Sequence, residues 1–349
     1  MKKTVTKLAD GRELLYFDTD EAVARDTPDL RSLDPVDSRP ELRRDPATGD
    51  WVTIASHRQA RTHRPPADAC PLCPSRDGRL GEVPAADYET VVFENRFPSL
   101  AGELGRCEVV CFTPDHETSF ADLSPARARL VLDAWTDRTA ALSARPDTAQ
   151  VYCFENRGAE IGVTLSHPHG QIYAFPRITP RTTKMITAAA AHRAATGRNL
   201  FEDLLAEARA TPERLVSTGT HWTAFVPYAA RWPYEVHLHP HRRVPDLTAL
   251  NEAERAEFPT LYLDLLRRFD RLFPDPAAPG GLLPAPYVSA WHQAPREGGR
   301  ELALHLELFT VRRGPAKLKH LAGTESGMEA FINDIAPEEA ARRLREAHG

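Results

Sequence analysis

The segment GVTLSHPHGQIY, residues 162–173, carries the densest chemical pattern in this sequence. In an extended chain, residues two positions apart face the same side, and a proline biases the residue before it away from helix. His167 and His169 flank Pro168 in this way, and Gly170 lets the backbone approach a bulky anion closely. The pattern predicts a turn leading into a strand, with one imidazole held in place while its neighbour faces a substrate.

The side chains of this segment suit chemistry at phosphorus. A neutral imidazole attacks phosphorus well when its second ring nitrogen donates to a fixed acceptor. Gln171 offers an amide donor to a phosphoryl oxygen, and Thr164 and Ser166 offer hydroxyls. A single histidine is more often an ordinary surface residue. The string HPHGQ with its hydroxyl neighbours favours a functional role for this pair of histidines instead.

Regular structure is expected on both sides of this segment. Runs rich in β-branched and aromatic residues predict strands at 51–56, 89–95, 107–114, 150–156 and 171–176. Ser124 and Pro125 are typical of the first two positions of a helix. The alanine-rich stretch 183–210 has the composition of one long helix.

The second half of the chain repeats this order of elements. Strands are predicted at 223–228, 234–239, 287–292 and 301–311, and Asn251 with Glu254 forms a capping box for a helix that ends near residue 273. The helix caps Ser124 and Asn251 stand 127 positions apart, and His167 and His305 stand 138 apart. We infer an internal duplication and an α+β fold, in which a largely antiparallel sheet carries helices on one face.

Three regions follow from these patterns. Proline makes up 30 of 349 residues and clusters early, so residues 1–75 are expected to form a loop-rich arm with one short strand. Residues 76–215 would form the first half, which carries HPHGQ, and residues 216–349 the second, degenerate half.

Composition narrows the function classes. Lys and Arg number 44 against 49 Asp and Glu, and the resulting charge of −5 argues against a nucleic-acid polymer as partner. No run approaches the ~18 apolar residues of a membrane span, and the first residues lack the apolar core of a signal peptide.

Five cysteines make a poor disulfide framework, so a cytoplasmic location is expected. Cys107, Cys111 and Cys153 are expected to be buried thiols, whereas the C-x-x-C pair Cys70 and Cys73 is typical of metal ligands.

FENRGAEIG followed by HPHGQIYAFP resembles the galactose-1-phosphate uridylyltransferases of the histidine-triad superfamily. The resemblance extends through RRDPATGDWVTIASHR, CPLC, VVFENRFPSL, VPYAARWPYE, SAWHQAP, LHLELF and KHLAGTESGMEAFIND. It implies duplicated histidine-triad halves, a homodimer, and transfer of UMP from UDP-glucose to galactose 1-phosphate in two steps. His169 would be the nucleophile, oriented by the His167 carbonyl, and Gln171 would bind the transferred phosphoryl group.

The resemblance also implies a structural zinc site at Cys70, Cys73, His116 and His167. Some relatives hold a second metal with a carboxylate and three histidines. Here His292 and His305 match, but Glu307 stands at the last histidine position, and no Asp or Glu occurs from residue 170 to 201. We therefore expect that second site to be absent. The alternating His237, His239 and His241 are expected to be structural.

Substrate contacts implied by the resemblance are spread along the chain. Asn95 would lie near the ribose, although Arg96 stands where relatives carry an acid, and Asn156 would lie near the phosphates. Arg43 would reach a phosphate, across a dimer interface. The hexose would meet Lys319, Gly323 and Glu325.

Two other functions stay open from the sequence. One is another nucleotidyltransferase of the superfamily, such as a dinucleoside polyphosphate phosphorylase. The second is a zinc-stapled nucleotide-binding module without catalysis.

Overall fold

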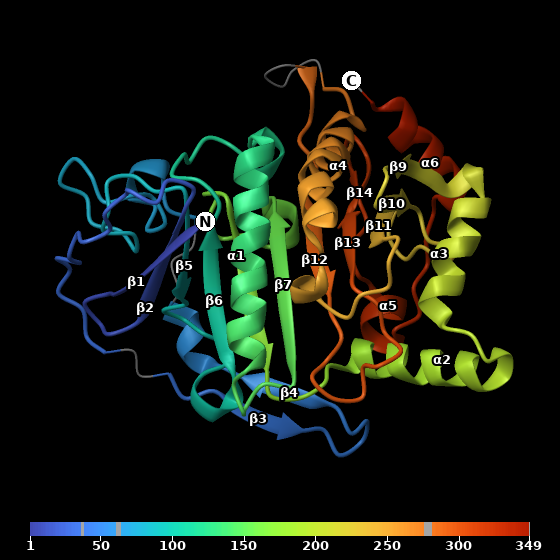
Figure 1. The fold of residues 1–349 in the computed structure, drawn as a ribbon, viewed down its shortest axis with the longest axis horizontal. Helices are drawn as coiled ribbons and strands as arrows, with labels where there is room; N and C mark the ends of the chain where they lie inside the picture. Colours follow the sequence, from blue (N-terminus) through green and yellow to red (C-terminus); the bar gives the residue numbers. More distant parts are fainter. Residues whose placement is uncertain (36–37, 61–63, 276–280, 349) are drawn as a thin grey trace. The chain divides into compact units, whose positions relative to one another are not determined.

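The computed structural model describes all residues except 36–37, 61–63, 276–280 and 349. The chain divides into two compact units. Unit 1 comprises residues 1–153, 164–186 and 294–300, and unit 2 comprises residues 154–163, 187–293 and 301–349. Each unit contains an antiparallel sheet with helices packed on it, so the predicted α+β class is confirmed (Figure 1).

The sheet of unit 1 is antiparallel from its first strand to β8. Its order is β1-β2-β5-β6-β8, and β7 follows β8. The bounds are β1 Lys2–Lys7, β2 Glu13–Asp18, β5 Thr90–Glu94, β6 Arg106–Cys111, β7 Gln150–Arg157 and β8 His169–Phe175. The predicted strands 89–95, 107–114, 150–156 and 171–176 are therefore confirmed, although β8 begins two residues earlier, at His169 itself.

The prediction of a loop-rich arm with a single strand is wrong for residues 1–75. β1 and β2 form a hairpin that extends the sheet, and β3 (Glu41–Arg44) pairs with β4 (Trp51–Ile54) in a separate hairpin. The signal for the first hairpin was present in the sequence, because two runs with β-branched or aromatic residues flank the turn residues Asp10 and Gly11. Gly11 adopts φ +85°, which glycine tolerates without strain.

Two layers enclose the sheet of unit 1. Helix α1 (Pro125–Ser143) begins as predicted, with the Ser124 hydroxyl accepting a hydrogen bond from the Arg127 amide. It contacts β2, β5 and β8, and its Arg138 pairs with the buried Glu108 of β6 at 2.8 Å. The opposite face of the sheet packs against apolar residues of the segment between residues 70 and 88. Cys70 and Cys73 lie in this second layer.

Unit 2 contains the strand order β12-β13-β11-β10-β9. The bounds are β9 Leu215–Thr218, β10 Trp222–Phe225, β11 Tyr234–Pro240, β12 Tyr287–His292 and β13 His305–Thr310. Helix α4 (Glu252–Arg271) has the predicted capping box of Asn251 and Glu254. The chain closes with β14 Arg312–Gly314, β15 Lys317–Leu318, α5 Gly323–Met328 and α6 Pro337–Glu346.

Helices cover both faces of the sheet in unit 2, so the expectation of a single helical face is wrong. The indole nitrogen of Trp222 in β10 donates to the Glu254 carbonyl of α4 at 2.8 Å. Phe225 lies on the opposite face of β10 and packs against Leu205 and Ala208 of α3.

The expected single helix at 183–210 is in fact two helices, α2 (Pro180–Thr196) and α3 (Leu200–Ala210). Gly197 at φ +72° ends the first, and the Asn199 side chain accepts hydrogen bonds from the first amides of the second. Composition alone hid this break because a Gly and a capping Asn stand among strong helix formers.

The order strand, strand, helix, strand, strand occurs twice, as β5-β6-α1-β7-β8 and as β10-β11-α4-β12-β13. His169 and His305 each open the last strand of their set, and in each the Nδ1 atom lies near the carbonyl oxygen two residues earlier. His305 therefore corresponds to His169, and the sequence pairing of His305 with His167 is wrong by two positions.

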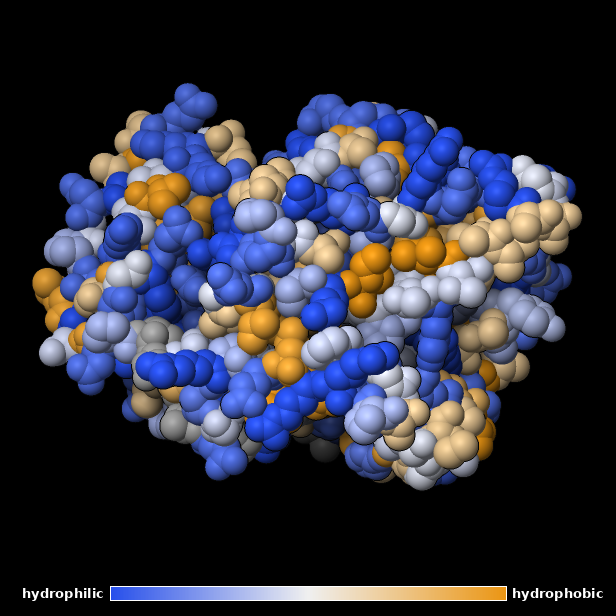
Figure 2. All heavy atoms as spheres, turned by 90° about the horizontal axis from the view of Figure 1, so that it is seen from below, coloured by the Kyte–Doolittle hydropathy of each residue, from blue (hydrophilic) through white to orange (hydrophobic). Residues whose placement is uncertain are grey.

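Hydrophobic residues form small groups bounded by hydrophilic ones on the face that Figure 2 shows. Among the described residues, no helix combines the length and apolar character that a membrane span requires.

Candidate functional site

His169 is held by its own motif. Its Nδ1 atom lies 2.7 Å from the carbonyl oxygen of His167. With the proton on Nδ1 as donor, Nε2 keeps a lone pair that no proton blocks. Burial lowers the pKa of His169, and the contact with the His167 carbonyl opposes this only in part. The neutral, nucleophilic form is thereby favoured near neutral pH.

Gln171 shares the face of β8 on which His169 lies. In the register with β6, His169 stands opposite Cys111 and Gln171 opposite Val109. Both β6 residues face the 70–88 segment, on the side away from α1. An amide group is thus placed two residues beyond the imidazole on the same face of the strand.

Four candidate metal ligands converge in unit 1. Cys70, Cys73, His116 and His167 each offer one ligand atom, and these atoms lie within 4.8 Å of one another. The Sγ atom of Cys73 is 3.3 Å from Nδ1 of His116 and 3.5 Å from Nδ1 of His167. Sulfur and nitrogen atoms around one tetrahedral Zn²⁺ are separated by about 3.5 Å. The donor set therefore fits a closed site of four ligands.

Outer contacts orient both imidazoles towards the cysteines. Nε2 of His167 lies 2.9 Å from the Thr113 carbonyl and 3.0 Å from the Tyr88 hydroxyl. Nε2 of His116 lies 3.0 Å from the Ser166 hydroxyl. A ligand histidine usually has its second nitrogen held in this way. Tyr88 and Thr113 escaped sequence reasoning because nothing in their local pattern distinguishes them from ordinary core residues.

The other site residues predicted in unit 1 occupy turns. The Thr164 carbonyl accepts from the Arg64 amide at 2.8 Å, and the Ser166 hydroxyl is engaged by His116 as described. The Asn95 side chain accepts from the Phe97 amide at 2.8 Å, and half-buried Arg96 lies in that same turn after β5.

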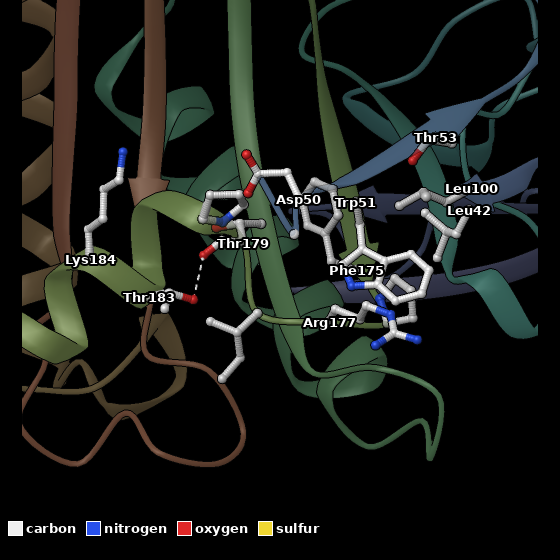
Figure 3. A pocket seen from close by; sticks show the side chains of 14 residues that line it. Leu42, Asp50, Trp51, Thr53, Leu100, Phe175, Arg177, Thr179, Thr183 and Lys184 are labelled. Carbon is white, nitrogen blue, oxygen red and sulfur yellow. Dashed lines mark hydrogen bonds between the residues drawn. The ribbon is translucent and has the colours of Figure 1, made fainter. Parts of the chain in front are cut away.

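Arg43 lies on the β3–β4 hairpin, with its guanidinium 2.8 Å from the Glu41 carboxylate. The hairpin borders a cavity of about 400 Å³, in which the Arg177 guanidinium lies 4.0 Å from the centre of the Trp51 ring (Figure 3). The other wall is the Phe175 end of β8. This end is roughly 20 Å along the strand from His169, because each strand residue advances about 3.3 Å.

In unit 2, the tail residues bind each other. The Lys319 ammonium donates to Glu325 at 2.9 Å and also to the Ile332 carbonyl, and the Thr324 hydroxyl donates to Glu325 at 2.9 Å. These contacts, led by that from Lys319, lower the pKa of Glu325 to about 2. Gly323 is the first residue of α5. To contact a sugar, Lys319 and Glu325 would have to separate, or the Glu325 carboxylate would have to accept a further hydrogen bond.

Asn156 is half-buried on β7, and its neighbour Glu155 is buried. Burial raises the pKa of Glu155 to about 8, against smaller lowering effects of Tyr287 and Arg157. A carboxyl whose pKa is higher in the folded than in the unfolded chain stabilises the fold at pH values below its pKa in the unfolded chain. For Glu155 this stabilisation is lost as the pH rises to about 8, its pKa in the folded chain.

We therefore predict that wild-type stability falls, from this group alone, by roughly 1.4 kcal/mol per pH unit between about pH 5 and pH 8. Glu155→Gln should remove that slope. The measurement is urea unfolding of both chains at pH 6 and pH 8. Equal changes in unfolding free energy for the two chains would contradict the prediction.

Comparison with known proteins decides the family. The family model for the galactose-1-phosphate uridyl transferase N-terminal domain matches residues 100–179, and that for the C-terminal domain matches residues 185–348. The chain belongs to the galactose-1-phosphate uridylyltransferase family. The predicted membership is thus confirmed, and the family is one of nucleotide-transferring enzymes.

Relatives in this family cover nearly the whole chain. The galactose-1-phosphate uridylyltransferase of Streptomyces lividans is 56% identical over 99% of this chain and 98% of its own length. The galactose-1-phosphate uridylyltransferase of Thermotoga maritima is 36% identical over 88% of this chain and 98% of its own length. A solved structure titled as a uridylyltransferase is 30% identical, with a TM-score of 0.74 over 88% of this chain and 97% of its own. An ADP-glucose phosphorylase from Arabidopsis thaliana shares the fold, with a TM-score of 0.68 at 22% identity.

Proposed function

We propose that this protein transfers UMP from UDP-glucose to galactose 1-phosphate through a covalent intermediate on His169. The observation that carries the proposal is the 2.7 Å contact between Nδ1 of His169 and the His167 carbonyl, which leaves Nε2 free to attack. Family membership supports the choice of substrates.

In the first step, Nε2 of His169 attacks the α-phosphorus of UDP-glucose. The new N–P bond forms as the bond between that phosphorus and the bridging oxygen breaks, and glucose 1-phosphate leaves with the electron pair. The positive charge that develops on the ring is stabilised by the His167 carbonyl at Nδ1. Gln171 donates to a non-bridging oxygen, where negative charge increases.

In the second step, a phosphate oxygen of galactose 1-phosphate attacks the same phosphorus. The N–P bond breaks, His169 regains its neutral form, and UDP-galactose leaves. Division into two steps suits imidazole, because a phosphoramidate is reactive enough to pass its group on. Thr164 and Ser166 are proposed to lie beside the phosphates, with the Ser166 hydroxyl shared with His116.

A labelling experiment tests this function. UDP-glucose labelled in its uridylyl group is incubated with the protein alone, and base-stable label on the chain is measured. Galactose 1-phosphate should then discharge the label as UDP-galactose. Label acquired from ATP, or discharged by inorganic phosphate alone, would instead favour a phosphorylase. Nucleotide binding without any label would favour a non-catalytic module.

We propose that Cys70, Cys73, His116 and His167 hold Zn²⁺ in a structural role. Four protein ligands leave no open position for a substrate, and thiolates with imidazoles select zinc among common cations. The ion would join the segment before β5 to the HPH turn, and thereby support the carbonyl that orients His169.

We further propose a homodimer that uses the β3–β4 hairpin as part of its interface. Trp51, Val52 and Ile54 on this hairpin are 42%, 50% and 37% exposed, which is unusual for such large apolar side chains. The hairpin that carries Arg43 borders the end of β8 that is remote from His169 in its own chain. A phosphate contact by Arg43 would therefore be made in the other subunit.

Mixing two inactive variants should reveal this contact. We expect Arg43→Ala and His169→Ala each to be inactive as homodimers. After co-refolding in equal amounts, about a quarter of the sites should be active, since half of the dimers are mixed and each has one intact site. If Arg43 acts within its own chain, no activity returns. Light scattering of the wild type checks the dimer itself.

The remaining substrate contacts are proposed from the family resemblance. Asn95 and Arg96 would lie near the ribose, Asn156 near the phosphates, and Lys319, Gly323 and Glu325 near the hexose. A cytoplasmic location, the boundaries at residues 75 and 215, and an origin of the two halves by duplication belong to the same proposal.

A further inference from the structure

A second group of imidazoles and carboxylates lies on three adjacent strands of unit 2, outside the site proposed above. β11 contributes Glu235, His237 and His239, β12 contributes His292, and β13 contributes His305 and Glu307. In the register, His237 is opposite Glu307, and His292 is opposite His305. Because side chains two residues apart share a face, all six project from one side of the sheet.

The ring nitrogens converge. His237, His239 and His305, hereafter the histidine cluster, each offer a nitrogen within 4.8 Å of the others. Nitrogen ligands of one tetrahedral ion are about 3.4 Å apart for ion–nitrogen distances of about 2.0–2.1 Å. The rings of His239 and His305 already stack at 4.7 Å between centroids.

A buried carboxylate accompanies the histidine cluster. Oε1 of Glu307 lies 3.5 Å from Nε2 of His305 and 3.6 Å from Nε2 of His237, and Oε1 of Glu235 lies 2.9 Å from that same His237 atom. Both glutamates are buried. A buried carboxylate is costly unless a positive charge or a metal ion accompanies it. Glu235 also accepts from the backbone amides of Arg231 and Trp232, whereas the Glu307 contacts are all with imidazoles, including His292 at 3.2 Å. Glu307 is therefore the carboxylate placed to accompany a cation.

One imidazole is already oriented as a ligand. Nδ1 of His305 lies 2.9 Å from the Ala303 carbonyl, so that Nε2 is left as the nitrogen that can bind a cation. Aromatic rings pack beside the cluster, since the Phe201 ring of α3 lies 5.8 Å from the His305 ring and the Phe225 ring 5.3 Å from the His239 ring. His239 and His305 are buried, and His237 is partly exposed.

We propose that His237, His239 and His305 bind a divalent first-row transition metal ion, with the Glu307 carboxylate next to it. This ligand set is not the one that the resemblance implied for a second metal, since two of its three imidazoles come from β11. Nitrogen and oxygen donors without sulfur suit zinc, iron, cobalt or nickel, unlike the thiolate site of unit 1. Its effect would be structural, because it would join β11 to β13.

The test is a titration of the metal-free wild-type chain with Co²⁺. Cobalt at the cysteine site gives thiolate charge-transfer absorption in the near ultraviolet, whereas cobalt at the histidine cluster gives only weak visible bands. We expect a second equivalent that adds visible bands without further charge transfer. If the wild-type chain binds only cobalt that shows thiolate absorption, the proposal is overturned. A single equivalent without thiolate absorption would support it and would instead refute the zinc site.

Variants locate the second equivalent. His237→Gln with His239→Gln should weaken cobalt binding at this site by at least about 100-fold, since two ligands are lost. His241→Gln is the matched control, because His241 belongs to the same alternating run but contacts the Thr223 hydroxyl at 2.8 Å instead. Retention of two equivalents by the double variant would place the ion elsewhere and contradict the proposal. Circular dichroism checks that each variant is folded.

Discussion

His169→Ala should lower the rate of UMP transfer by at least about 10⁴-fold, which corresponds to roughly 5 kcal/mol of transition-state stabilisation. The reason is that alanine has no nitrogen to form the covalent bond to phosphorus, so the reaction loses its intermediate and not only a favourable contact. The measurement is the steady-state rate of UDP-galactose formation, together with the label retained on the chain from UDP-glucose.

The control separates loss of the nucleophile from general damage to the protein. His348→Ala removes an exposed imidazole near the end of the chain that contacts Asp264 at 3.2 Å, far along the sequence from the HPHGQ motif. It should keep both rate and label. If His169→Ala still acquired the label, His169 would not be the nucleophile.

Cys73→Ser should cost several kcal/mol of stability and abolish zinc at the cysteine site. Structural zinc contributes about 10–16 kcal/mol to the folding of small zinc peptides, which is comparable to the whole stability of an ordinary domain. Cys73 lies within 3.5 Å of both candidate histidine ligands, so its loss would leave two imidazoles in a buried site without their shared partner. A fall in melting temperature of roughly 10 °C or more is expected.

Cys107→Ala is the matched control for this experiment. Cys107 is likewise a buried cysteine of unit 1, and burial raises its pKa to about 11, as expected for an ordinary core thiol. The variant should keep its zinc and lose only about 1 kcal/mol. Elemental analysis and thermal unfolding give both values. A Cys73→Ser chain as stable as Cys107→Ala, with zinc content unchanged, would rule out the structural site.

Local patterns gave most of the elements correctly. The Ser124 and Asn251 caps, the strands around residues 90 and 290, and the turn before β8 all depend on residues within a few positions of one another. Because such signals act over a few residues, they can be read without the tertiary structure. The elements that the sequence patterns failed to predict also have local causes. The break between α2 and α3 depends on Gly197, and the β1–β2 hairpin depends on the turn at Asp10 and Gly11.

The arrangement proposed for the HPHGQ segment, one held imidazole with its neighbour facing a substrate, can be predicted from the chain itself, because strand alternation and one proline decide how neighbouring residues face. The meeting of Cys73 with His116 and His167 has no such local cause, and only family resemblance suggested it beforehand. Alternating histidines in β11 look the same in sequence whether they pack in a core or bind an ion. Antiparallel pairing with β13, about 70 residues away, brings His237 opposite Glu307, and contacts over that distance are specified by the whole packed sheet and not by any short pattern.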